Sequence, residues 1–264
     1  MSCLFCLLLA LAFSYSFAAD DNDLPPTTDT IRVVSQGRTL ELYTTYWDST
    51  RQIHLRHGTY RKWDEQGHLW TEEEWRRGVR QGASRYYFEN GILAEEIQYQ
   101  KGKPEGWHRW WDRQGHLVRE SEYHNGEAQG LYREWYPNGT KALETSLNNA
   151  TYNGIVQTWH SNGKRASFGK FKAGKRNGLH QQWGDSGVQT DEINWKEGLQ
   201  DNVSRHYSPD GKLRMESWWS AGQRQGPTRT WYDNGQIQSE SWWDHGKQQR
   251  MRIWDHNGIL LQST

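Results

Sequence analysis

Glycine recurs through most of this chain at an interval of 24 residues, and a second glycine series follows the first nine residues behind it. The two series keep one phase over eight copies, without insertion or deletion. Such self-similarity indicates a repeat protein in which each unit contacts only its neighbours, so function is expected on an extended surface. The first series is Gly58, Gly82, Gly106, Gly130, Gly154, Gly178, Asn202 in place of glycine, and Gly226; the second is Gly67, Gly91, Gly115, Gly139, Gly163, Gly187, Gly211 and Gly235.

Each unit has the pattern of a β-hairpin. In residues 106–125, two short runs rich in aromatic and alternating residues flank the turn Asp-Arg-Gln-Gly. The final glycine of this turn supplies the positive φ that short hairpin loops need. A third glycine series, which begins with Gly78 and Gly102, precedes a short polar link that reverses the chain again. All of these glycines are interpreted as turn residues.

The composition does not fit a globule with an aliphatic core. Trp occurs 17 times among 264 residues, and the mean hydropathy is −1.07. Together with the hairpin pattern, these values predict an all-β fold. We expect an elongated, open, single-layer antiparallel sheet of consecutive hairpins, twisted and about 17 strands long.

Four columns of equivalent residues accompany the glycines. Two are mainly aromatic, exemplified by Trp111 and Tyr123, and two are charged, exemplified by Arg109 and Glu120. If the hairpin is centred on its turn, the arginine and glutamate columns face each other and form cross-strand ion pairs. The alternative is that the arginines stack over the first aromatic column and present a cationic surface to a ligand.

The ends of the chain differ from the repeats. Residues 1–19 are typical of a secretory signal peptide with cleavage near Ala18, although a short membrane anchor is the alternative. Both cysteines, Cys3 and Cys6, lie in this leader. Residues 20–36 are expected to form an acidic, proline-containing tether, 37–57 an N-terminal cap hairpin, 58–249 eight repeats and 250–264 a terminal half repeat. The protein is therefore expected to be exported and periplasmic or associated with the cell envelope.

Catalytic chemistry is not indicated. The 11 histidines fall at many phases of the repeat, and no histidine–carboxylate set recurs with it, so neither a metal site nor another cofactor is expected. The sequence contains no nucleophile elbow, P-loop or dinucleotide-binding glycine pattern. We therefore expect a protein that is not an enzyme.

The repeat departs from its own pattern most strongly between residues 145 and 184. This stretch contains no Asp or Glu but six Lys and Arg residues. On a chain with a formal net charge of zero, it forms a local positive patch with aromatic residues interleaved. The bland interpretation is a solvated face; the functional one is a contact site for an acidic partner surface or an anionic head group. The candidate partner-binding residues are Trp159, Lys164, Arg165, Lys170, Phe171, Lys172, Lys175, Arg176 and Trp183.

The order of glycine, Trp or Tyr, Asn-Gly, glutamate, aromatic and Gly-Lys resembles the MORN repeat, and more closely its bacterial variant. It is seen from Trp231 through Gly235, Glu240 and Trp243 to Lys247, and the resemblance covers roughly residues 58–264. It implies an open, twisted, single-layer sheet. Many bacterial proteins of this variant are classed as antitoxins or immunity-type proteins, and others as binding scaffolds without enzyme activity.

These observations lead to an expected function. The chain is predicted to be an exported, non-enzymatic scaffold that binds another protein, with an antitoxin or immunity role against an envelope-acting toxin or effector implied by the resemblance. The alternative is a structural module of the envelope that binds glycan or anionic membrane lipid through its aromatic and basic columns. Nucleic acid is not an expected partner, given the overall neutrality and the expected export.

Overall fold

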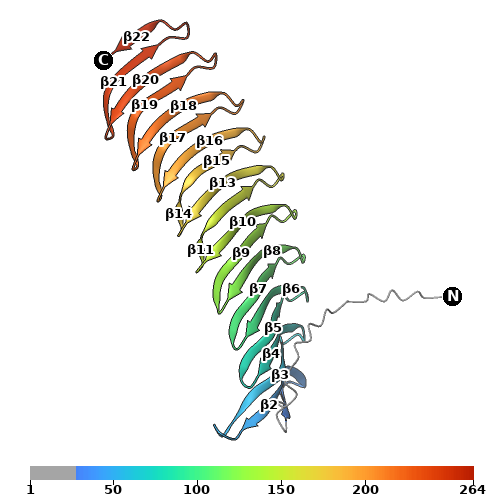
Figure 1. Ribbon diagram of the computed structural model, residues 1–264. Coiled ribbons are helices and arrows are strands. Elements are labelled where there is room, and N and C mark those ends of the chain that lie inside the picture. Colours follow the sequence, from blue (N-terminus) through green and yellow to red (C-terminus); the bar gives the residue numbers. More distant parts are fainter. Residues whose placement is uncertain (1–27) are drawn as a thin grey trace, which may run out of the picture.

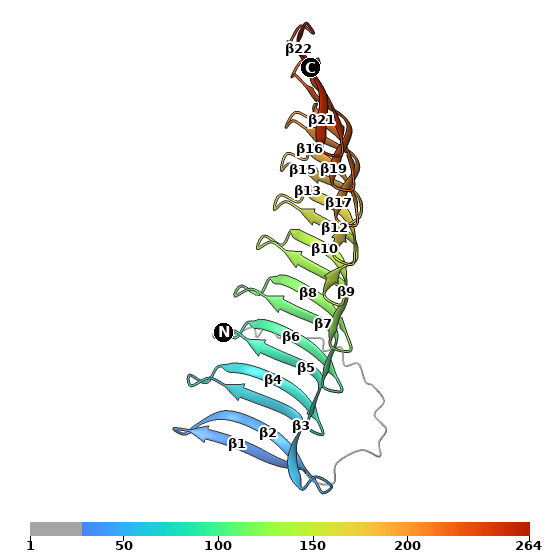
Figure 2. The ribbon, with the colours of Figure 1, turned by 90° about the vertical axis from the view of Figure 1, so that its left-hand side faces the viewer.

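A computed structural model describes residues 28–264, which form one open antiparallel sheet of 22 strands. The sheet is a single layer of stacked hairpins (Figure 1), with β1 and β22 at opposite ends (Figure 2). It twists along its length, so that the hairpins at one end are seen broadside and those at the other edge-on (Figure 2). The predicted fold class is confirmed.

The strands of the first half are β1 (Thr28–Ser35), β2 (Arg38–Asp48), β3 (Ile53–Trp63), β4 (Leu69–Arg76), β5 (Val79–Tyr87), β6 (Leu93–Gln100), β7 (Lys103–Trp111), β8 (Leu117–His124), β9 (Glu127–Trp135), β10 (Lys141–Asn148) and β11 (Thr151–Tyr152). Those of the second half are β12 (Gly154–Trp159), β13 (Arg165–Lys172), β14 (Lys175–Arg176), β15 (Gly178–Trp183), β16 (Gln189–Lys196), β17 (Leu199–Tyr207), β18 (Leu213–Ser220), β19 (Gln223–Trp231), β20 (Ile237–Asp244), β21 (Lys247–Trp254) and β22 (Leu260–Ser263).

Consecutive strands pair along the chain, so the topology contains only local connections. Two strands are split: Asn153 separates β11 from β12, and Asn177 separates β14 from β15. The sheet continues across both interruptions, because β10 also pairs with β12 and β13 with β15. Both splits lie inside the stretch where the sequence departs from its repeat.

The first glycine series does not lie in turns, which corrects the sequence interpretation. Gly82 and Gly106 lie inside β5 and β7, at φ of +90° and +85°. The pairing register shifts opposite these two glycines, between Glu73 and Trp75 in the neighbouring strand β4 and between Ile97 and Tyr99 in the neighbouring strand β6. Each therefore occupies a β-bulge, where the left-handed conformation favours glycine.

The N-terminal boundary also differs from the expectation. Thr28–Ser35, assigned from the sequence to the tether, forms β1 and pairs with β2. Its β-branched residues, among them Ile31, Val33 and Val34, favour a strand over a solvated linker. The signal peptide expected at residues 1–19 and the rest of the tether up to residue 27 lie outside the described residues.

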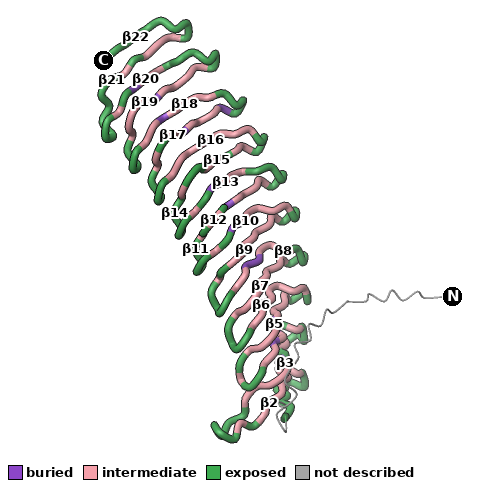
Figure 3. The backbone as a smooth tube through the Cα atoms, viewed as in Figure 1, coloured by how far each residue is buried: buried purple, intermediate pink, exposed green. Residues whose placement is uncertain are grey.

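Little of the molecule is buried, as Figure 3 shows along the whole sheet. The most buried side chains are small and polar: Ser84 and Ser217 have no exposed surface. Ser217 lies on the same face as Trp219, a member of the second aromatic column, two residues along β18. Ser204, which pairs with Ser217, accepts a hydrogen bond from the Trp219 indole N–H at 2.8 Å. Large rings stacked over small residues thus replace a conventional core on this face of the sheet.

Candidate functional site

The predicted Arg–Glu pairs form a ladder on the other face, which we call the ion-pair face. Within hairpins, Nε of Arg85 lies 2.7 Å from Glu96 and Nε of Arg133 lies 2.8 Å from Glu144. The ladder also bridges hairpins, because Glu120 accepts hydrogen bonds from both Arg109, at 3.2 Å, and Arg133, at 2.9 Å. Other pairs within hairpins are Arg61–Glu72, Arg205–Glu216 and Arg229–Glu240.

The paired arginines of the ladder are therefore engaged by glutamates, whereas the alternative interpretation had them present a cationic surface to a ligand. Hydrogen bonds from Lys141 and Arg133 lower the pKa of Glu144, and the carboxylates of Glu144 and Glu120 raise the pKa of Arg133. Each half-exposed pair contributes only about 0.2–1 kcal/mol. Its main effect is to neutralise the paired arginine and glutamate side chains of the ion-pair face.

The ladder is interrupted in the middle of the chain. Gln157, Phe168 and Gln181 occupy the three consecutive ladder positions between Glu144 and Glu192. On the C-terminal side, Nε2 of Gln181 donates to Glu192 at 3.2 Å. No charge is carried by the three intervening side chains.

Two further rows flank this interruption on the same face. Side chains two residues apart in a strand point to the same side, so Ile155 and Leu179 share the face of Gln157 and Gln181, and Lys170 that of Phe168. Toward the hairpin turns, Arg165 is paired with Trp159. Its guanidinium carbon lies 5.7 Å from the ring centroid of Phe168 and 5.5 Å from that of Trp183.

Nine residues from three neighbouring strands thus make one surface, which we call the acid-free block. Its members are Trp159, Arg165 and Trp183; Gln157, Phe168 and Gln181; and Ile155, Lys170 and Leu179. Ile155 is 48% exposed and Leu179 40%. Lys170 has no ion-pair partner among residues 28–264, and exposed aliphatic side chains beside this lysine and a stacked arginine suit a partner that carries apolar and acidic groups.

The structure places the sequence-predicted site residues in the acid-free block, in a hairpin turn and toward the other end of the hairpin. Trp159, Arg165, Lys170 and Trp183 belong to the acid-free block. Lys164 lies in a hairpin turn, where Nζ donates to the Ser186 carbonyl at 2.7 Å.

The remaining candidates lie toward the other end of the hairpin. Lys172 and Lys175 face each other across the short link between β13 and β14, and both are exposed. Phe171 and Arg176 lie on the opposite face, against His180 and Trp195. These two are therefore not positioned to act with the block.

Sequence reasoning missed Ile155, Leu179 and Gln181. The 24-residue period places Gln157 and Gln181 at positions of the arginine column that lack arginine, and strand alternation from them puts Ile155 and Leu179 on the same face.

Comparison with protein-family models agrees with this architecture. The model described as MORN repeat variant matches residues 80–101 and 224–241, which fall in hairpins on either side of the acid-free block. The two matched segments are MORN-variant repeats. MORN repeats are a non-catalytic repeat type that generally mediates protein or lipid binding. No curated protein matches the chain.

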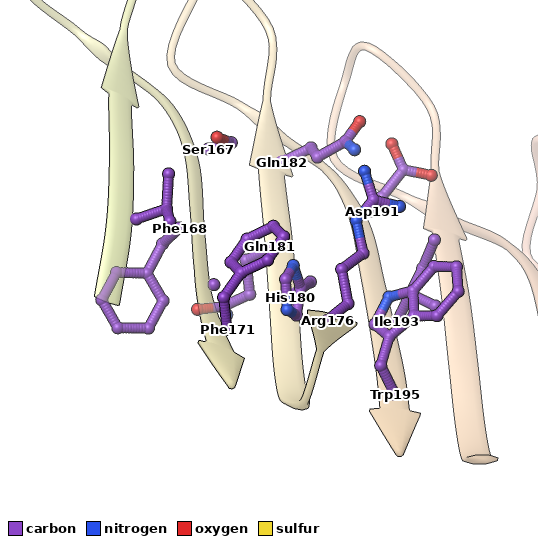
Figure 4. Close-up of a pocket in the computed structure, with 12 residues that line it drawn as sticks. Ser167, Phe168, Phe171, Arg176, His180, Gln181, Gln182, Asp191, Ile193 and Trp195 are labelled. Carbon is purple, nitrogen blue, oxygen red and sulfur yellow. The ribbon is translucent and has the colours of Figure 1, made fainter. Parts of the chain in front are cut away.

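Behind the acid-free block, the sheet forms a small cavity of about 100 Å³ (Figure 4). Gly169 and His180 line this cavity. Gly169 leaves space beside its backbone, where a Cβ would lie 2.2 Å from Nδ1 of His180. The His180 ring occupies this space, and Nε2 lies 2.9 Å from the Lys170 carbonyl. Burial, together with the nearby Arg176, lowers the pKa of His180. The imidazole is therefore neutral near pH 7 and donates from Nε2.

Residues 28–264 offer no cluster of three or more His, Cys, Asp or Glu suited to a metal ion. Histidines in this range make local contacts, as where Nδ1 of His116 lies 3.1 Å from Asp112 in a turn. Within the same range, no helix is long and apolar enough to cross a membrane.

Proposed function

We propose that this repeat scaffold binds an acidic protein through the acid-free block. The carrying observation is the replacement of an Arg–Glu ladder by Gln157, Phe168 and Gln181, beside the exposed side chains of Ile155, Lys170 and Leu179. A structural ladder position gains nothing from Phe168, whereas an interface gains a central apolar contact surrounded by cations. Lys172 and Lys175 extend the positive charge to the adjoining edge and would accelerate encounter with an acidic surface.

We further propose that the protein is exported and that its partner is a toxin or effector acting in the bacterial envelope. The support for export is the leader in the sequence, and the support for an immunity role is the resemblance to bacterial MORN-variant proteins. Intact-mass measurement of the cell-envelope fraction tests export: the expected species begins near residue 19 and lacks Cys3 and Cys6. A mass that retains both cysteines would instead indicate a membrane anchor.

Affinity capture with matched charge reversals tests the binding surface. The test variant carries Lys170→Glu, Lys172→Glu and Lys175→Glu. The control carries Lys103→Glu, Lys196→Glu and Lys247→Glu, which reverse three exposed lysines on the same side of the hairpins but in separate repeats. Both variants have the same net charge.

We expect the control to capture the same acidic protein as the parent from an envelope extract, and the test variant to lose at least about tenfold in affinity, mainly through slower association. Co-expression of the scaffold should also relieve growth inhibition by the captured protein. Equal capture by the two variants would exclude the block as the binding surface. Capture without growth relief would retain the scaffold but reject the immunity role.

A further inference from the structure

Trp70 breaks the repeat at a position far from the acid-free block. The equivalent positions in the other seven units hold Ala94, Val118, Ala142, Ala166, Thr190, Arg214 and Gln238. Trp70 is the unpaired residue of a bulge, because Lys62 pairs with Thr71 and Trp63 with Leu69. Its side chain is 52% exposed. A large ring displayed at a position where alanine suffices elsewhere has no evident role in the fold.

This ring lines a cavity of about 460 Å³ formed by three consecutive hairpins. The first hairpin contributes Gln66 and Trp70, the second Phe88 and Glu89, and the third Arg113. Such a volume lies in the range typical of small-molecule sites. The cavity is outside the protein-binding surface described above and does not depend on it.

Two cations support the aromatic walls of the cavity. Nζ of Lys62 lies 5.0 Å from the Trp70 ring centroid, and the guanidinium carbon of Arg113 lies 5.5 Å from that of Phe88. The Arg113 carbonyl accepts a hydrogen bond from Nδ2 of Asn90 at 2.9 Å, which ties the second turn to the third. Phe88 and Arg113 are thus presented by two connected turns, and Trp70 by the strand β4.

The polar groups of the cavity differ in their availability. Asp64 is engaged in its own turn, where Oδ1 accepts from the backbone N–H groups of Gln66 and His68, and Oδ2 lies 3.0 Å from Nδ1 of His68. Among the described residues, the side chains of Gln66 and Glu89 make no such bond, and both are exposed. The site therefore offers a free amide and a free carboxylate beside exposed rings.

We propose that this cavity binds a neutral saccharide. One face of a pyranose ring is lined with C–H groups that pack on an aromatic plane, while its equatorial hydroxyls both donate and accept hydrogen bonds. Trp70 and Phe88 suit the first property, and the planar side chains of Gln66, Glu89 and Arg113 suit the second. The carboxylates of Asp64 and Glu89 offset the two cations, Lys62 and Arg113, so the cavity lacks the net positive charge that an acidic sugar would need.

Titration with neutral trisaccharides tests the proposal. The probes are chitotriose, cellotriose and maltotriose, followed by the tryptophan indole N–H signals in NMR spectra. Trp70→Ala should preserve the fold, because alanine stands at this position in three other repeats. Trp242→Ala is the matched control: Trp242 is 36% exposed, with the guanidinium carbon of Arg250 4.6 Å from its ring centroid, but it lies five repeats away from the cavity boundary.

We expect at least one trisaccharide to bind with a Kd on the order of 1 mM. Trp70→Ala should weaken that binding about tenfold or more, Glu89→Gln should weaken it less, and Trp242→Ala should leave it unchanged. Lack of binding by all three sugars up to about 10 mM would overturn the proposal. So would equal losses in the two tryptophan variants. Neither result bears on protein capture by the acid-free block.

Discussion

Phe168 lies directly opposite Gln157 in the β12–β13 hairpin, at the positions that hold Glu144 and Arg133 in the preceding hairpin. There, Nε of Arg133 and Oε2 of Glu144 are 2.8 Å apart. The same backbone register therefore supports an ion pair in one repeat and an uncharged pair in the next. This contrast separates what the fold requires at these positions from what a ligand would require.

Restoring the ion pair should separate stability from binding. The double variant Gln157→Arg, Phe168→Glu places an arginine between two glutamates and should raise the free energy of unfolding by about 0.2–1 kcal/mol. It should also abolish capture of the acidic partner, because it introduces a carboxylate at the centre of the acid-free block. Chemical denaturation and the capture assay measure the two effects. Gln157→Arg alone should retain capture, and a double variant that still binds would argue against the block.

A side chain at residue 169 should displace His180. Gly169→Ser places a Cβ 2.2 Å from the present position of Nδ1 and should cost about 1–3 kcal/mol of stability. Adding His180→Thr recreates the pair Ser217 and Thr228, which face each other between β18 and β19. A double-mutant cycle in chemical denaturation should therefore show a favourable interaction energy. Additive losses would mean that His180 does not occupy this space.

Replacing one strained alanine should stabilise the protein. Ala150 has a φ of +56°, at a link position that holds glycine in the other seven repeats, and its N–H still donates to the Ala128 carbonyl at 2.9 Å. Ala150→Gly should raise the free energy of unfolding by about 1 kcal/mol, because the left-handed conformation is costly for residues with a Cβ. Ala166→Gly, within β13, should lower it by about 0.5–1 kcal/mol. Thermal and chemical unfolding measure both variants. A shift of the free energy of unfolding in the same direction for both would contradict the assignment of strain to Ala150.

Stability should fall as the solution becomes mildly acidic. The pKa values of His180 and His57 are lowered in the folded protein, so the unfolded chain binds protons first as the pH falls. Their contribution is complete above the usual histidine pKa of about 6.5 and is lost below it. Denaturation at about pH 7.5 and 5.5 should show this loss, and His180→Thr should reduce it. An unchanged pH dependence in this variant would indicate that His180 titrates normally.

Much of the fold could be predicted from the sequence because each repeat is specified locally. The spacing of Gly82 and Gly106 gives the 24-residue length of the repeat, and Gly115 marks the turn of its hairpin. The opposition of Arg109 to Glu120 follows from centring the hairpin on this turn. The resemblance to the MORN repeat could be recognised in the same way, since glycine and aromatic phases persist over eight copies. The candidate site was predicted only in part. The charge pattern identified residues 145–184, but it did not indicate which of these residues lie on which face of the sheet.

The sequence by itself determined the period, the hairpins and the stretch in which the repeat changes. Only the tertiary structure decided which side chains of that stretch act together. Side chains alternate between faces with a period of two, and a single bulge or break reverses the alternation. The bulge at each first-series glycine and the breaks at Asn153 and Asn177 do this repeatedly. Lys170 thus shares a surface with Leu179, whereas Phe171, its neighbour in the chain, packs against His180 on the other side of the sheet.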